Sequence, residues 1–228
     1  MSPYEKAWQA TRERIAGAAA AAGRDPTAIR LLAVSKGMPA EAIRAAYAAG
    51  QRAFGENYVQ EAATKMAALA DLPGIEWHLI GPLQGNKARI AAARFDWVES
   101  VDRLATAERL SATRDVRQPP LAVCVQVNIS AEATKSGVAP GEALALTRSI
   151  ASLPSLALRG FMGIAEPTPE FARQRAQFRV LREMLAAARA EGLMLDTLSM
   201  GMSGDLEAAI AEGATLVRVG SALFGARG

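Results

Sequence analysis

The sequence predicts an α/β fold, a single (β/α)8 TIM barrel over residues 1–228 with an extra helix at the N-terminus. Eight short apolar runs alternate with amphipathic helix patterns, as in a chain of βα units. The fifth run, Leu121–Val127, is apolar at almost every position, which is typical of a parallel strand buried on both faces. The length of 228 residues favours the barrel over the competing topology, a doubly wound open sheet.

The first expected element is a helix at about Tyr4–Ala22. The strands that follow are short apolar runs, with Pro and Gly between the periodic segments. The predicted strands are Arg30–Ser35, Arg52–Gly55, Glu76–Ile80, Trp97–Ser100, Leu121–Val127, Ala157–Met162, Thr197–Met200 and Leu216–Val219.

Each predicted strand leads into a helix pattern, except the last, which leads to the chain end. Several of these helices carry N-terminal signals, with Pro in the first turn or Asp or Ser just before the apolar stripe. The segment Ala139–Ser152 illustrates the helical period of 3.6 residues. The predicted helices begin near Pro39, Glu56, Gly85, Asp102, Pro140, Pro169 and Ser203.

Composition and charge argue against several classes of protein. The net charge is only +3, and Arg is spread over many helix patterns without the basic block that nucleic-acid binding requires. Cys124 is the one cysteine and lies in an apolar run, which indicates a buried thiol in a reducing compartment. The N-terminus lacks a signal-peptide pattern, and the run Ala16–Ala22 is too short to span a bilayer. We therefore expect a cytoplasmic monomer that binds neither nucleic acid nor a membrane.

Lysine is scarce in this chain, which has 21 Arg but five Lys. Lys36 ends the apolar run that starts at Leu31, at the C-terminal tip of a predicted strand. A lysine desolvated at such a position can lose its proton and form a Schiff base with a carbonyl group, whereas arginine stays protonated. The competing interpretation is that Lys36 only extends to the surface where the strand ends.

Polar residues and glycines gather where the predicted strands end. In a parallel barrel these C-terminal ends build the active face, so the clustering predicts a functional site there. Residues at or just after the strand ends include Lys36, Glu56, Asn57, Gln84, Glu99, Asn128, Lys135, Ser199 and Arg218.

The loops after the seventh and eighth strands have the composition of an anion site. Ser203 is placed to cap a helix over Asp205–Glu212, and glycines let backbone N–H groups approach an anion. Gly220 and Ser221 add a second group of N–H and hydroxyl donors. Phosphate sites in such barrels usually form from these two loops, although an ordinary serine cap with turn glycines gives the same pattern.

A Schiff-base lysine on the first strand and a phosphate site at the last two suggest one ligand across the barrel mouth. Pyridoxal 5'-phosphate (PLP) carries an aldehyde and a phosphate at about that separation. Arg218 could then face the pyridine nitrogen, keep it unprotonated and make the ring a weaker electron sink. Asn57 could orient the ring, and His78 could flank it. Each residue has an alternative role. Arg218 could be a buried arginine paired with a carboxylate, Asn57 a turn asparagine and His78 a satisfied core histidine.

These residues and their order resemble the pyridoxal phosphate homeostasis proteins, which are similar to the N-terminal barrel domain of alanine racemase. The resemblance runs from about Leu31 to Gly225. The matching segments are 32–36 (LAVSK), 54–61 (FGENYVQE), 77–87 (WHLIGPLQGNK), 127–128 (VN), 135–137 (KSG), 198–203 (LSMGMS), 217–220 (VRVG) and 224–225 (FG).

The resemblance implies that PLP is held as a covalent aldimine on Lys36 and that Arg218 faces the pyridine nitrogen. It also implies that the phosphate lies among Ser203, Gly220 and Ser221. Ser199 and Asn57 are then expected nearby. The loop at Ala131 and Ala133 departs from the family pattern, as does Phe161.

The function that the resemblance implies is intracellular PLP homeostasis without robust catalysis, by buffering the cofactor or delivering it to PLP-dependent apo-enzymes. The alternative is an amino-acid racemase, which needs acid and base groups on opposite faces of the ring. Lys36 supplies one group, and the other would have to be Tyr58, His78 or water. A Schiff-base aldolase, a third class, has no need of Arg218.

Overall fold

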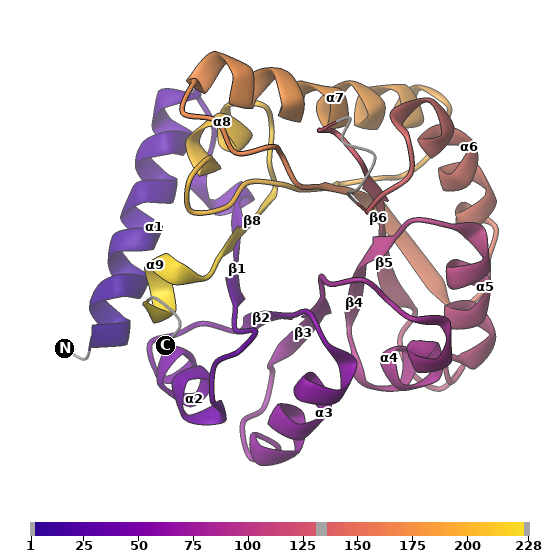
Figure 1. Cartoon of the computed structure of the whole chain (residues 1–228), viewed down its shortest axis with the longest axis horizontal. Coiled ribbons are helices and arrows are strands. Elements are labelled where there is room, and N and C mark those ends of the chain that lie inside the picture. Colours follow the sequence, from indigo (N-terminus) through magenta and orange to yellow (C-terminus); the bar gives the residue numbers. More distant parts are fainter. Residues whose placement is uncertain (1–2, 131–135, 226–228) are drawn as a thin grey trace.

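The computed structural model of the chain describes residues 3–130 and 136–225. Within these residues, eight parallel strands close into a barrel in sequence order, with β8 paired to β1. Helices form a ring outside the barrel (Figure 1), so the predicted α/β fold, a (β/α)8 barrel with an extra N-terminal helix, is confirmed. The strands are β1 (Arg30–Val34), β2 (Ala53–Glu56), β3 (Glu76–Leu79), β4 (Trp97–Val101), β5 (Leu121–Val127), β6 (Leu156–Gly163), β7 (Thr197–Ser199) and β8 (Leu216–Val219).

The helices connect successive strands on the outside of the barrel. Within the described residues, none of them combines the length and the apolar character that crossing a lipid bilayer requires. The α-helices are α1 (Pro3–Ala21), α2 (Ala40–Ala48), α3 (Val59–Ala68), α4 (Ala88–Arg94), α5 (Leu104–Thr113), α6 (Pro140–Ala151), α7 (Phe171–Ala190), α8 (Leu206–Ala211) and α9 (Ser221–Phe224). Short 3-10 turns occur at η1 (Pro26–Ala28) and η2 (Gly85–Lys87).

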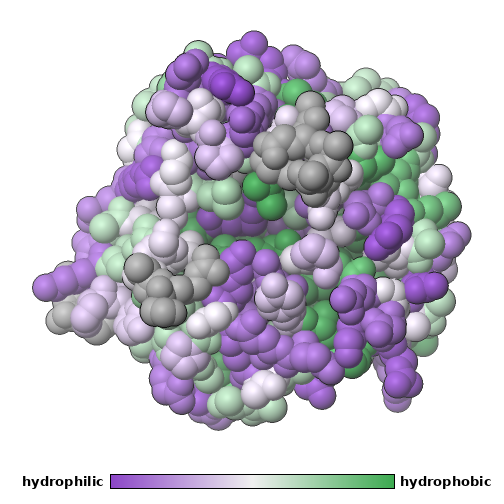
Figure 2. Space-filling model, viewed as in Figure 1, coloured by the Kyte–Doolittle hydropathy of each residue, from purple (hydrophilic) through white to green (hydrophobic). Residues whose placement is uncertain are grey.

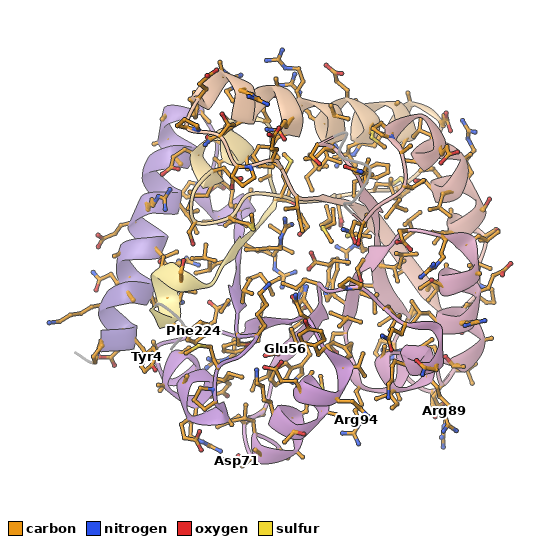
Figure 3. All side chains as sticks on the ribbon, viewed as in Figure 1. Tyr4, Glu56, Asp71, Arg89, Arg94 and Phe224 are labelled. Atoms are coloured by element: carbon orange, nitrogen blue, oxygen red, sulfur yellow. The ribbon has the colours of Figure 1, made fainter. Side chains whose placement is uncertain are left out.

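The extra helix α1 packs against α8 and α9, beside the point where the last strand meets the first (Figure 1). It buries Ile15, and its Tyr4 ring lies edge-on to Phe224 with centroids 6.2 Å apart (Figure 3). Further along the helix, Arg14 makes a bidentate ion pair with Glu207 of α8. These contacts tie the start of the chain to its end.

The element boundaries differ from the prediction by one to three residues in several places, and three differences concern the strand ends near the site. The helix expected near Glu56 begins at Val59, because Glu56 is the last residue of β2. After β8 a short helix follows where only the chain end was expected. The expectation that Ser203 caps the next helix is wrong: the cap position is Asp205, whose carboxylate accepts a hydrogen bond of 2.5 Å from the Met202 N–H.

Alternating side chains give each strand an outer and an inner face. The outer faces form the main apolar core with the helices and include fully buried Phe54 and Phe161. The interior contains two smaller apolar clusters, one of which includes Cys124 as the buried thiol expected from the sequence. Polar side chains are also buried there, and Figure 3 shows side chains filling the centre of the ring. The barrel is therefore a packed core with a site at one end.

Candidate functional site

A cavity of about 470 Å³ opens at the C-terminal ends of the strands. Figure 2 shows the molecule hollowed at the middle of the ring. Of the residues predicted to bind a cofactor, those that line this cavity are Lys36, Asn57, Ser203, Arg218, Gly220 and Ser221. The remaining one, Ser199, is fully buried and does not line it. The fold thus brings the predicted group together, and the binding roles stay predictions.

Lys36 lies in the cavity wall directly after β1, and contacts on both sides hold its backbone in place. The Ser35 N–H donates to the Gly55 carbonyl (2.9 Å), which extends the pairing of β1 with β2 to the residue before Lys36. On the other side, the Gly37 N–H donates to Glu61 Oε1 at 2.6 Å. The lysine therefore projects from a fixed point of the barrel rim.

A buried cluster behind this loop also anchors it and was not predicted from the sequence. Lys65 Nζ donates to the Ser35 carbonyl (2.8 Å), to Glu56 Oε1 (2.8 Å) and to Glu61 Oε1 (2.6 Å). Ser35 Oγ also donates to Glu56 Oε1 at 2.6 Å. Burial raises the pKa of Glu56, although the hydrogen bonds from Lys65 and Ser35 oppose the shift. Glu61 and Lys65 stand four residues apart in α3, a spacing that could have signalled their pairing.

Arg218 forms part of the cavity floor and is 4% exposed. Nη1 donates to Ser199 Oγ at 2.7 Å, and Nη2 donates to the Gly163 carbonyl at 2.8 Å. Burial lowers the pKa of Arg218, and the nearby charges of Glu99 and Asp205 oppose that shift. A guanidinium has five N–H donors, so three donors remain beyond these two bonds. The link from Arg218 to the buried carboxylate of Glu99 runs through Ser199 and is not a direct pair.

His78 lies below the cavity and does not line it. Nδ1 is 2.6 Å from Glu99 Oε1, Nε2 is 2.6 Å from Glu76 Oε1, and the ring stacks on Trp97 with centroids 5.1 Å apart. Burial alone would lower the pKa of His78, but the two carboxylate hydrogen bonds outweigh it and raise the pKa. His78 is therefore a satisfied core histidine, which was its alternative role.

The loops after β7 and β8 form another part of the cavity wall. Gly201 has φ +93°, and a Cβ there would lie 2.5 Å from the Ala209 Cβ, so only glycine lets this loop pass so close to α8. The Ser203 carbonyl accepts a hydrogen bond of 2.7 Å from Arg14, which fixes the loop to α1. Ser203 is half-buried and Ser221 is exposed, so both can meet a ligand that enters from solvent.

Asn57 is placed by a close approach between two strand ends. A Cβ on Gly81 would lie 2.3 Å from the Asn57 carbonyl oxygen, so glycine at 81 lets the chain after β3 pass against this residue. The next side chain, Tyr58, is 66% exposed and does not line the cavity.

Comparison with known proteins identifies the family of the chain. Residues 8–228 match the family model "Alanine racemase, N-terminal domain". The pyridoxal phosphate homeostasis protein of Pseudomonas aeruginosa is 61% identical over 214 residues, which are 94% of this chain and 91% of the relative. The protein of the same name from Escherichia coli K12 is 50% identical over 221 residues, 95% of this chain and 93% of the relative.

The chain belongs to the pyridoxal phosphate homeostasis protein family. The resemblance inferred from the sequence motifs is therefore confirmed. A solved structure of PipY from Synechococcus elongatus, described as having PLP bound, is 44% identical with a TM-score of 0.81 and covers 92% of this chain and 100% of PipY. Alanine racemase from Corynebacterium glutamicum is 20% identical with a TM-score of 0.67 and covers 96% of this chain and 61% of the racemase, which shows a shared fold alone.

The homeostasis-family motifs leave some cavity residues without a predicted role. Gln126 of β5, Asn128 and Ser136 also line the cavity, and Gln126 Nε2 donates to the Ser136 carbonyl at 3.3 Å. Gln126 was the one polar residue in an otherwise apolar run, and that was the available signal. Lys135, singled out in the same loop, lies outside the described residues, as do Ala131 and Ala133.

Proposed function

We propose that this protein binds PLP in the cavity at the barrel mouth and buffers or delivers it within the cell, without robust catalysis of its own. The observation that carries the proposal is the meeting of Lys36, Arg218, Ser203 and Ser221 in one cavity. The described relatives support it, since they are named for PLP homeostasis and one solved structure has PLP bound.

The donor set of the cavity fits PLP in kind. An amine can react with the aldehyde, a guanidinium can meet the ring nitrogen, and hydroxyl and backbone N–H groups can meet the phosphate. In the proposed covalent step, Lys36 Nζ attacks the aldehyde carbon, the C=N bond forms and one water molecule leaves. This gives the aldimine on Lys36, with Ser203, Gly220 and Ser221 around the phosphate.

Arg218 determines what the bound cofactor is suited for. A permanent cation beside the pyridine nitrogen disfavours its protonation, which weakens the ring as an electron sink. In this proposal Asn57, which lines the cavity just after β2, orients the ring. Ser199 acts through Arg218, since its hydroxyl holds the guanidinium and does not reach the cavity.

The lining of the cavity favours a carrier over a racemase. Racemisation requires two groups that exchange protons on opposite faces of the ring. Among the described residues that line the cavity, Lys36 and Arg218 are the only basic or acidic side chains, and Arg218 stays protonated. The other candidates, Tyr58 and His78, lie outside the lining, with Tyr58 mostly in solvent and His78 held between two carboxylates.

The proposal is tested by loading the purified protein with PLP and recording its absorption spectrum. We expect one PLP for each chain in the wild type and in Lys87→Ala, a control at another lysine after a strand end, but no Schiff-base absorption in Lys36→Ala. A colourless wild-type protein, or an unchanged spectrum in Lys36→Ala, contradicts the proposed site.

Two further assays test for catalysis and for delivery. Alanine chirality followed by circular dichroism distinguishes a carrier, which turns over no faster than free PLP, from a racemase. For delivery we propose a cytoplasmic monomer that passes PLP to PLP-dependent apo-enzymes. Activation of an apo-enzyme by the loaded protein, with free PLP trapped by an added amine, is the expected result.

A further inference from the structure

A row of polar side chains crosses the barrel interior beneath Arg218. Its members come from four strands: Glu76 and His78 of β3, Glu99 of β4, Ser199 of β7 and Arg218 of β8. His78, Glu99 and Ser199 are 0% exposed, and Arg218 is 4% exposed. Barrel interiors are usually filled by bulky branched apolar residues. Filling space therefore does not explain this row.

Consecutive hydrogen bonds join these side chains. Arg218 Nη1 donates to Ser199 Oγ at 2.7 Å, and Ser199 Oγ in turn donates to Glu99 Oε2. The other oxygen of Glu99 lies 2.6 Å from His78 Nδ1, and His78 Nε2 lies 2.6 Å from Glu76 Oε1. At the far end Glu76 pairs with Arg30, which is partly in solvent. The row thus connects the floor of the cofactor cavity to the opposite end of the barrel.

The charges in this row follow from its hydrogen bonds. An ionised carboxylate only accepts, so a histidine between two carboxylates carries a proton on both ring nitrogens and is a cation. Burial would raise the pKa of Glu99, but its bonds to His78, together with Arg218 and Ser199, outweigh that effect and lower it. Glu99 is therefore a buried anion between two cations, His78 and Arg218.

We propose that Glu99 and His78 are positioning residues that set the orientation of Arg218 and the charge around it. Through Arg218 they set the protonation of the Schiff base that Lys36 forms with PLP. The inference rests on the proposed function. Glu99 orients Ser199, whose oxygen then accepts from Arg218. His78 neutralises part of the charge of Glu99, so the net charge of the two residues determines the electrostatic potential in the cavity.

This arrangement predicts opposite effects for two conservative variants. Glu99→Gln removes an anion below the cavity and makes the protonated Schiff base less favourable, so the pH midpoint of the spectral transition falls. His78→Asn removes a cation but keeps a donor near Glu99, so the midpoint rises. We expect each shift to be about one pH unit, the low end for a charge near a titrating group.

The other charged or titratable groups in and around the row are not substituted in either variant, and in His78→Asn Glu76 loses the bond to His78 but keeps Arg30 as its partner. These groups are Arg30, Glu76, Asp96, Cys124, Arg159 and Asp205. The matched control is Glu212→Gln, the same substitution at an equally buried carboxylate that pairs with arginines of α7. It is expected to reduce stability without moving the spectral midpoint.

The experiment titrates the absorption spectrum of PLP-loaded wild type, Glu99→Gln, His78→Asn and Glu212→Gln, with borohydride reduction and mass spectrometry of each. Midpoints that shift in opposite directions for Glu99→Gln and His78→Asn support the inference. Shifts in the same direction, or none, overturn it while Lys36 is still labelled. A wild type without a label on Lys36 overturns the proposed function instead. If Glu99→Gln does not fold, an upward shift in His78→Asn supports the inference and its absence overturns it.

Discussion

Replacing Lys65 with methionine tests whether the buried cluster behind Lys36 holds the loop. Methionine keeps most of the length of lysine, so the substitution removes the ammonium group with little change in packing volume. Lys65 is 8% exposed and Glu56 is 0% exposed. Without Lys65, Glu56 keeps only its bond from Ser35, and its Oε2 has no hydrogen-bond partner among the described residues. Breaking a buried pair in this way costs about 3–5 kcal/mol, and this is the loss of unfolding free energy that we expect.

The pH dependence of this loss follows from Glu56. Burial already raises its pKa above the usual 4.5, and loss of Lys65 raises it further in the folded state. A carboxyl with a raised folded-state pKa stabilises the fold fully below its unfolded value, and that contribution is lost as the pH rises through the folded value. The deficit of Lys65→Met is therefore larger at about pH 8 than at about pH 5.

Urea unfolding followed by tryptophan fluorescence measures both effects. The double variant Lys65→Met/Glu56→Gln removes the unpaired charge and should recover about 2 kcal/mol of the loss, because a buried pair replaced by neutral groups is often nearly neutral. A deficit below about 1 kcal/mol, equal deficits at both pH values, or a double variant no more stable than the single one would show that Lys65 does not hold the loop through the charge of Glu56.

Three further predictions concern the row of polar residues and the cysteine. Arg218→Glu should raise the pKa of the ring nitrogen of bound PLP by about 1–3 units and change its spectrum; an unchanged spectrum argues against their contact. The pKa of Glu76 is held at about 2 by His78 and Arg30 against the effect of burial, so its stabilisation is present above pH 4.5 and lost as the pH falls towards 2. In Glu76→Gln, acid unfolding followed by circular dichroism should depend less on pH than in the wild type. Identical acid unfolding curves for the two proteins would count against this pairing. Burial raises the pKa of Cys124, so a thiol reagent should label it only in urea, and rapid labelling of the native protein would be the contrary result.

The fold was predictable because parallel strands buried on both faces are continuous apolar runs, and the helices between them keep a period of 3.6 residues. In a parallel barrel the C-terminal ends of the strands lie at the same end. This placed Lys36, Asn57 and Arg218 at one end of the barrel without any knowledge of side-chain contacts. Nearness in space at this level depends only on topology.

The contacts within the site were not predictable in the same way. Glu99 and Ser199 are 100 positions apart and meet only because alternate residues of β4 and β7 point into the barrel. The capping error at Ser203 has a local reason: Asp205, two residues later, offers a stronger acceptor and takes the Met202 N–H. Two candidate caps so close together cannot be ranked from sequence spacing alone.

The proposed function depends on a covalent bond between Lys36 Nζ and the aldehyde carbon of PLP. Peptide mapping after borohydride reduction of the PLP-loaded protein tests it most directly. We expect a single pyridoxyl group on the peptide that contains Lys36. A label on Lys65, Lys87 or another lysine, or no label at all, would contradict it.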